Sequence, residues 1–427
     1  MAWSRKRIVW VVASAVVTLL ATLLVVNLMP AERRIEHRIE RQYATGSPQF
    51  YRSLGVLLGP PTLSGNRVQD LQNGDAIFPA MLAAIRSAQR TISFETYIYW
   101  SGDIGRAFAD ALAERARAGV RVNVLLDWVG SQKIDEALLD EMRKAGVAIE
   151  FYRPLHWYHV ARLNNRTHRK LLVVDGRIGF TGGVGIADKW GGHAEDPEHW
   201  RDSHYRIEGP AVAQMQATFL DNWTKVTGLV LHGEEYFPAI ASSGESRAQM
   251  FSSSPEGGAE SMQLMYLLSI TAAGKTIDLA SSYFVPDRLT VNALVEAMKR
   301  GVRFRLILPG PIIDTEVVRR ASRATWGPLL AAGAEIHEYQ PTMFHCKVMI
   351  VDGLLVSVGS TNFDTRSFRL NDEANLNIYD AAFAAAQTAV FEQDLARSRR
   401  ISLSEWESRP WHEKLVERAA SLLSPQL

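Results

Sequence analysis

Two segments of this chain follow nearly the same pattern. Residues 168–175 read HRKLLVVD and residues 345–352 read HCKVMIVD, so histidine, lysine and aspartate recur at the same spacing. Each segment then runs on toward a glycine pair or a glycine-serine pair. Because self-similarity within one chain indicates a repeated structural unit, the duplication predicts two similar domains that each carry half of one site.

The spacing within each copy predicts a strand and a phosphate site. The four residues between the lysine and the aspartate are apolar, which is typical of a buried strand, and residues two apart on a strand share one face. The histidine and the lysine therefore point the same way, roughly 6 to 7 Å apart along the chain. A lysine contributes a compact positive charge and a histidine can act as nucleophile or proton carrier, a pair that suits a phosphate better than a metal. The aspartate falls on the other face or at the strand end, where we interpret it as structural.

The repeat extends over most of the chain after residue 90. Three further pairs of segments match at offsets of about 180 residues: 91–97 with 276–283, 118–127 with 300–309, and 145–150 with 332–337. Each copy thus reads strand, helix, strand, helix, strand and then the strand that carries histidine and lysine. This order predicts an α/β fold of two similar domains, each a mixed or parallel sheet flanked by helices.

The second copy also resembles a known family. It continues from Asp352 to Gly359-Ser360-x-Asn362 and so reproduces without a gap the HKD signature of the phospholipase D superfamily. The first copy is similar, but Gly183 and Gly185 stand where serine and asparagine are usual. The resemblance implies two phospholipase D-like domains whose signatures meet in one cleft. It names as catalytic candidates His168, Lys170, Asp175, His345, Lys347 and Asp352, and as phosphate-binding candidates Ser360 and Asn362.

Two carboxylates are candidates for orienting the histidines. A catalytic histidine needs a partner on its far ring nitrogen to fix its tautomer. Glu373 stands where members of the superfamily place this residue after the second signature, and Asp202 looks like its counterpart after the first. The alternative for both is a surface carboxylate without such a role.

Three segments are similar to bacterial cardiolipin synthases: 282–287 (SYFVPD), 344–347 (FHCK) and 359–371 (GSTNFDTRSFRLN). This resemblance implies phospholipid substrates, with phosphatidylglycerol expected. The implied reaction transfers a phosphatidyl group through a phosphohistidine to a second phosphatidylglycerol and releases glycerol, without a cofactor or a metal. By the same resemblance His168 is the nucleophile and His345 the general acid.

Other functions stay open on the sequence alone. A phospholipase D that hydrolyses phospholipids to phosphatidic acid would use the same residues. A nuclease or other phosphodiesterase of the superfamily is the third reading, but a net charge of +1 offers no broad basic footprint, so no nucleic-acid partner is expected. His193, His199 and His204 match no zinc spacing and are interpreted as part of a polar loop. The oligomeric state is left open.

The N-terminus predicts a membrane anchor. Arg5-Lys6-Arg7 precede an apolar run from Ile8 to Met29, which is long enough to cross a hydrocarbon core of about 30 Å. We interpret residues 1–30 as an uncleaved anchor in the cell (inner) membrane, with a cleaved signal peptide as the alternative. The charge distribution favours the extracytoplasmic side for the catalytic part. The aromatic residues Trp157, Tyr158 and Trp190 are candidates for a lipid interface or, equally, for core packing.

The remaining boundaries follow from composition. Residues 31–64 are expected as a stalk and linker, helical over 31–43 where the charges alternate in sign. Residues 65–238 and 262–400 are the two expected phospholipase D-like domains, and 239–261, rich in Ser, Gly and Glu, is the linker between them. Residues 401–427 are expected as a C-terminal amphipathic helix packed on the body.

Overall fold

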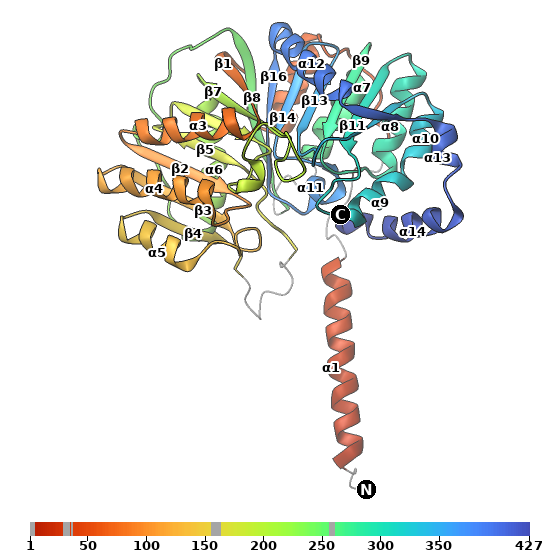
Figure 1. The fold of residues 1–427 in the computed structure, drawn as a ribbon, viewed down its shortest axis with the longest axis horizontal. Coiled ribbons are helices and arrows are strands. Elements are labelled where there is room, and N and C mark those ends of the chain that lie inside the picture. Colours follow the sequence, from red (N-terminus) through yellow and green to blue (C-terminus); the bar gives the residue numbers. More distant parts are fainter. Residues whose placement is uncertain (1–4, 29–34, 36, 155–163, 256–260) are drawn as a thin grey trace.

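The computed structural model describes residues 5–28, 35, 37–154, 164–255 and 261–427 (Figure 1). Trp157 and Tyr158 lie outside these ranges. Helix α1 (Arg5–Leu28) projects away from the body of the molecule. Its segment Arg5–Leu23 has a mean hydropathy of 1.7 and is not buried, and among the described residues α1 is the only helix long and apolar enough to cross a membrane. The expected anchor thus takes the form of one exposed apolar helix.

In the described part of the chain, fifteen strands form one continuous sheet whose strand order repeats. From the centre outward, the first half runs β1, β7, β6, β5, β2, β3, β4, and the second runs β8, β16, β14, β13, β9, β11, β12, with β17 at its outer edge. In each half the triplet β2-β3-β4 or β9-β11-β12 is parallel, whereas the inner neighbours are antiparallel. The prediction of two similar α/β halves is confirmed, and each half-sheet is mixed.

The elements follow one another in nearly the same order in both halves. The first half contains β1 (Leu63–Gln72), α3 (Asn73–Ser87), β2 (Thr91–Thr96), α4 (Asp103–Arg117), β3 (Arg121–Asp127), α5 (Glu136–Lys144), β4 (Ala148–Tyr152), β5 (Leu171–Val174), β6 (Ile178–Gly182), the 3₁₀ turn η2 (Asp188–Trp190), β7 (Ser203–Glu208) and α6 (Ala211–Thr227). The second half contains β8 (Ser246–Ser253), α7 (Ser261–Ala272), β9 (Thr276–Ser281), β10 (Phe284–Val285), α8 (Arg288–Lys299), β11 (Arg303–Pro309), α9 (Glu316–Ala324), α10 (Trp326–Ala331), β12 (Glu335–Tyr339), β13 (Lys347–Val351), β14 (Leu355–Gly359), β15 (Phe363–Asp364), α11 (Thr365–Arg369), β16 (Glu373–Tyr379), α12 (Ala381–Ala396) and β17 (Ser398–Ile401).

The two halves share one of their hydrophobic cores. Helices α3, α4 and α5 pack with one face of the first half-sheet, and α7, α8 and α10 do the same in the second half. On the other face, α6 and α12 belong to a single cluster that includes Phe219 and Trp223 of α6, Met250 of β8 and Phe391 of α12. This shared core fixes the halves relative to each other.

Strand β8 lies at the seam between the halves. It falls within residues 239–261, which were expected as a linker, and it pairs with β16 on one side and with β1 on the other. The segment rich in serine and glycine therefore carries a strand at the centre of the sheet, where main-chain hydrogen bonds join the two halves.

The expectation of a helical stalk over 31–43 is wrong for the residues that the structure describes there. Residue 35 and residues 37–47 contain no helix. Ile39 and Tyr43 pack against the core of the second half, and apolar burial of this kind outweighs the exposed i,i+4 charge pairs that the sequence pattern suggested. The helix of this region begins later, as α2 (Pro48–Leu58), capped by Ser47.

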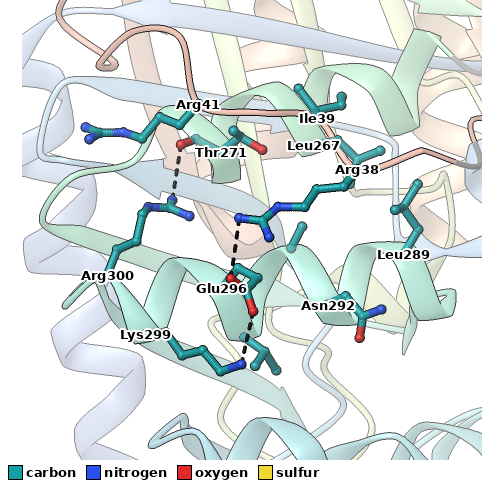
Figure 2. Close-up of a pocket in the computed structure, with 12 residues that line it drawn as sticks. Arg38, Ile39, Arg41, Leu267, Thr271, Leu289, Asn292, Glu296, Lys299 and Arg300 are labelled. Atoms are coloured by element: carbon teal, nitrogen blue, oxygen red, sulfur yellow. Dashed lines mark hydrogen bonds and ion pairs between the residues drawn. The ribbon is translucent and has the colours of Figure 1, made fainter.

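A cavity of about 400 Å³ lies where this extended segment crosses α7 and α8 (Figure 2). Arg38 pairs with Glu296 at 3.4 Å, and Glu296 also pairs with Lys299 at 3.0 Å. Arg300 donates to the carbonyl oxygen of Thr271 at 3.1 Å, near the end of α7. Of these contacts, the Arg38–Glu296 pair joins the segment that follows α1 to helix α8 of the second half.

The C-terminal range 401–427 forms two short helices rather than one. They are α13 (Leu403–Glu407) and α14 (Trp411–Ser421), followed by the 3₁₀ turn η3 (Ser424–Gln426). Pro410 separates them, because proline cannot continue a helix from the residues before it.

Asp175 and Asp352 hold turns at the ends of the strands that carry the duplicated motif. The carboxylate of Asp175 accepts the backbone N–H groups of Gln89, Arg90 and Thr91 at 2.7–2.9 Å. The carboxylate of Asp352 accepts those of Gly274, Lys275 and Thr276 at 2.7–3.2 Å. Both aspartates have a positive φ, 51° and 54°, a conformation that aspartate tolerates better than most residues. These contacts agree with the structural interpretation of both aspartates, and neither is among the residues that line the cavity described below.

We expect Asp352→Ala to destabilise the protein without changing its chemistry. The variant loses the acceptor for three N–H groups and puts alanine in the left-handed conformation, so the free energy of unfolding should fall by about 2 kcal/mol. Thermal melting in detergent measures this, and Asp110→Ala, at an exposed position on α4, is the matched control. Turnover per folded molecule should stay within twofold of wild type; a loss of turnover without a loss of stability would restore the catalytic role.

Candidate active site

The two copies of the motif meet where the halves exchange short main-chain bridges. The N–H of His168 donates to the carbonyl oxygen of Asp372 at 2.8 Å, and the N–H of His345 donates to that of Arg201 at 2.7 Å. Each histidine is thus held by the residue that precedes the candidate carboxylate of the other half. This arrangement places both histidines in the seam between the half-sheets.

The histidine-carboxylate pairs cross from one half to the other. Nδ1 of His168 lies 3.0 and 3.1 Å from the two carboxylate oxygens of Glu373, and Nδ1 of His345 lies 2.7 Å from Oδ2 of Asp202. Both carboxylates are fully buried and both histidines are more than nine-tenths buried. The two expected orienting carboxylates therefore contact the histidines, each through the partner half.

Burial favours the neutral form of both histidines, whereas the neighbouring positive groups favour the charged form of both carboxylates. Burial lowers the pKa of His168 to about 4, an effect that Glu373 opposes and the neighbouring Lys170 reinforces. Burial and Lys347 lower the pKa of His345. Burial alone would raise the pKa of Glu373 and Asp202, but the facing histidine and lysine hold both below their usual values. An ionised carboxylate accepts a hydrogen bond from Nδ1–H, which leaves the lone pair of Nε2 available for chemistry.

The two lysines lie beside their histidines, but the strands begin later than the sequence pattern predicted, β5 at Leu171 and β13 at Lys347. Lys170 Nζ donates to the carbonyl oxygen of His168 at 2.9 Å, and Lys347 Nζ donates to that of His345 at 2.7 Å. Lys347 also donates to Ser282 Oγ. Burial, with Lys347 nearby, lowers the pKa of Lys170 to about 7. An anion bound beside Lys170 would favour the charged form of its ammonium group.

A cavity of about 410 Å³ opens at this seam. His168, Lys170, His345 and Asn362 line it, so the sequence motifs from both halves face one space. Its further walls come from residues that the motifs did not single out for this site, among them Tyr97, Arg166, Trp200, Tyr283, Arg366, Gln426 and Leu427. These residues lie far apart in the sequence, and only the fold brings them together.

Ser360 positions a carboxylate and does not line the cavity. Its Oγ donates to Glu373 Oε2, and its backbone N–H donates to the carbonyl oxygen of Ala374 at 3.0 Å. Ser360 thus supports Glu373, and its expected contact with phosphate stays a prediction. Asn362 does line the cavity, and its Oδ1 is buried without a hydrogen-bond partner among the described residues. A buried amide group of this kind is suited to a polar ligand.

In the first half, a tryptophan donates the hydrogen bond to the carboxylate that orients the histidine, as Ser360 does in the second half. Trp190 Nε1 donates to Asp202 Oδ2 at 2.9 Å. A Cβ atom on Gly183 would lie 2.2 Å from Asp202 Oδ1, and one on Gly185 would lie 3.1 Å from the Trp190 ring and 2.8 Å from Ile98. The two glycines therefore make room for Asp202 and for the indole. The sequence showed that Gly183 and Gly185 lack the usual serine and asparagine side chains, but it did not show that Trp190 contacts Asp202 instead.

Aromatic rings surround the two histidines unequally. The rings of Trp190 and Trp200 lie 5.3 and 5.6 Å from that of His345, whereas His168 has Tyr97 at 5.2 Å. The apolar indoles exclude water from one side of His345. Trp190 is fully buried, so its place is at the site rather than at a lipid interface.

One cluster outside the cavity has the residue types of a cation site. Glu195, Asp196 and His199 bring one ligand atom each within 4.8 Å of one another, in the polar loop expected around His193, His199 and His204. His204 does not belong to this loop, because it lies on β7 and is 1% exposed. The three side chains are exposed or half-exposed, and His199 Nδ1 lies 2.9 Å from Asp196 Oδ1. Hydrogen bonding within the loop accounts for this arrangement.

Comparisons with known proteins identify the family. The model of a family described as cardiolipin synthase, PLD-like domain, matches residues 81–223 and 266–395. The cardiolipin synthase of Geobacillus kaustophilus is 36% identical over 370 residues, which cover 86% of this chain and 74% of the relative. Cardiolipin synthase 2 of Bacillus anthracis is 36% identical over 360 residues, covering 84% and 70%. The crystal structure of phosphatidylserine synthase from Haemophilus influenzae has a TM-score of 0.69 at 14% identity, covering 89% of this chain and 100% of that one, a likeness of fold.

We expect Gly183→Ser to disable the site locally. Its Cβ would fall 2.2 Å from Asp202, so the carboxylate must move away from His345, and turnover should fall about 100-fold, as when the group that orients a catalytic histidine is lost. Steady-state rates in detergent, with circular dichroism to verify the fold, measure this. Gly55→Ser is the control, because nothing lies within 3.8 Å of its added Cβ. Full turnover by the Gly183 variant would contradict the importance of the Asp202 position.

Proposed function

Because the chain belongs to the cardiolipin synthase family of phospholipase D-like proteins, we propose that it transfers a phosphatidyl group from one phosphatidylglycerol to another and releases glycerol. The observation that carries this proposal is the pair of neutral, carboxylate-oriented histidines that face one cavity from opposite halves. Such a pair can serve as nucleophile on one side of a phosphodiester and as proton donor on the other.

The first step forms a covalent intermediate. Nε2 of His168 attacks phosphorus in line, the bond to the glycerol oxygen breaks, and His345 gives that oxygen its proton. The negative charge of the bound phosphodiester favours the protonated form of His345. Glu373 holds the Nδ1–H of His168 and stabilises the positive charge that develops on its ring, as carboxylates do for other catalytic histidines.

The second step reverses the proton transfer. His345, now neutral, removes the proton from a hydroxyl of the second phosphatidylglycerol, and that oxygen attacks phosphorus and displaces His168. The product is cardiolipin. Lys170 and Asn362, which line the cavity, would stabilise the oxygens of the phosphate in both steps, and Lys347 adds its charge from beside His345. Such an electrostatic contribution is usually the largest in reactions of this kind. No residue role here calls for a metal or an organic cofactor.

The membrane arrangement belongs to the same proposal. Helix α1 anchors the protein in the cell membrane by a single span, and the basic residues Arg5, Lys6 and Arg7 favour a cytoplasmic N-terminus. The catalytic body then lies on the extracytoplasmic side, next to the lipids that it uses. Its partners are the phospholipid substrates themselves.

Purified full-length protein in detergent, given phosphatidylglycerol labelled in its phosphate and in its free glycerol, tests the proposal. We expect labelled cardiolipin and free glycerol in equal amounts. His168→Gln and His345→Gln should each lower turnover by at least about 10³-fold, since each removes a group needed in both steps. His232→Gln, at an exposed histidine, is the matched control.

Two outcomes would contradict the assignment. Phosphatidic acid as the only lipid product would make water the acceptor and the protein a hydrolase, and a lack of turnover on phosphatidylglycerol would remove the proposed substrate. A chelator should leave the rate within twofold of its starting value, and a larger loss would contradict the metal-free mechanism.

A further inference from the structure

The C-terminal helix α14 has one face packed on the body. It lies against α9, where Glu417 pairs with Arg323 at 3.1 Å. Glu417 also pairs at 2.8 Å with Arg409, which lies just before α14. Glu417 is 4% exposed, and Ala420 is buried in a cluster with Val318. These contacts fix the rotation of α14 about its own axis.

The opposite face of α14 is apolar and exposed. Trp411, Leu415 and Leu422 are 76%, 60% and 78% exposed, and at 100° per residue they fall on one stripe, nearly opposite Glu417 and Ala420. Lys414 and Arg418 flank the stripe on one side. Large apolar side chains gathered on an exposed helix face mark an interaction surface rather than ordinary exposure.

This surface is connected to the mouth of the candidate active site. After α14 the chain passes through η3 to Gln426 and Leu427, which line the catalytic cavity. The N–H of Arg366 donates to the carbonyl oxygen of Leu427 at 2.9 Å, and its guanidinium donates to that of Gln426 at 3.0 Å. Figure 1 shows α14 along the rim of the body from which α1 leaves, with its axis across that of α1.

We propose that α14 lies in the membrane interface, with Trp411, Leu415 and Leu422 inserted among the lipids, and so holds the mouth of the catalytic cavity at the level of the headgroups. This contact would let a phospholipid enter the cavity without leaving the bilayer. This role for α14 rests on the proposed function. Three observations favour a bilayer over a protein partner. Tryptophan prefers the membrane-water boundary, the lysine and arginine beside the stripe suit anionic headgroups, and α1 already tethers this rim to the membrane.

A fluorescent probe tests the contact itself, independently of turnover. The only cysteine of the chain, Cys346, is 1% exposed, so Leu415→Cys can be labelled selectively in the full-length protein. In nanodiscs of phosphatidylcholine and phosphatidylglycerol, lipids with brominated acyl chains should quench this probe strongly. Leu57→Cys on α2, where Leu57 is 52% exposed, is the control and should not be quenched. Equal quenching at both positions, or none at either, would overturn the proposal.

A triple variant then tests what the contact does. Trp411→Ser, Leu415→Ser and Leu422→Ser together should lower kcat/KM for phosphatidylglycerol in nanodiscs about tenfold, while activity on a short-chain, water-soluble phosphatidylglycerol stays within twofold. Val56→Ser with Leu57→Ser should change neither activity. An equal loss on both substrates would show that α14 only supports the fold of the cavity. A variant that dissociates a dimer, seen by light scattering, without losing activity in nanodiscs would show that a second copy covers this face.

Discussion

The structure depends on a reciprocal exchange between its halves: each histidine takes its carboxylate partner from the other half. His168 faces Glu373, and His345 faces Asp202. Neither half alone therefore holds a histidine with its orienting carboxylate. Two features hold the halves together for this purpose. Strands β1 and β8 join the half-sheets, and helices α6 and α12 are buried in one core. The seam must be rigid, because a shift of about 1 Å there would alter both pairs at once.

The duplication is symmetric in its backbone and asymmetric in its chemistry. Ser360 and Asn362 serve the second half, where one holds Glu373 and the other lines the cavity. In the first half Trp190 holds Asp202, and Gly183 and Gly185 leave the space that this requires. The environment of His345 is consequently more apolar than that of His168. The proposed reaction also treats the two histidines differently, since one bonds to phosphorus and the other carries a proton.

The sequence predicted the repeat and the two half-sheets, because the strand and helix patterns recur in the same order. The meeting of the two motifs in one cleft was predicted from the resemblance to the phospholipase D superfamily, and His168, Lys170 and His345 line one cavity. The sequence could not show the crossing of the carboxylates, since that depends on how the halves dock. For the same reason the sequence could not show that Trp190 donates to Asp202 as Ser360 donates to Glu373. The tryptophan follows Gly183 by seven residues, and only the fold brings it to Asp202. The prediction of a helical stalk over residues 31–43 was wrong because Ile39 and Tyr43 pack against the core, and this packing outweighs the local charge pattern.

The central claim is that the two halves form one site in which a single histidine becomes covalently linked to the substrate. Its most direct test is to quench the full-length protein during turnover of phosphatidylglycerol that carries radioactive phosphorus, digest it at alkaline pH, where phosphohistidine survives, and locate the label by mass spectrometry. The account predicts label on the peptide that contains His168, stable to alkali and lost in acid. Label on any other residue, or full turnover with no trapped label, would contradict it.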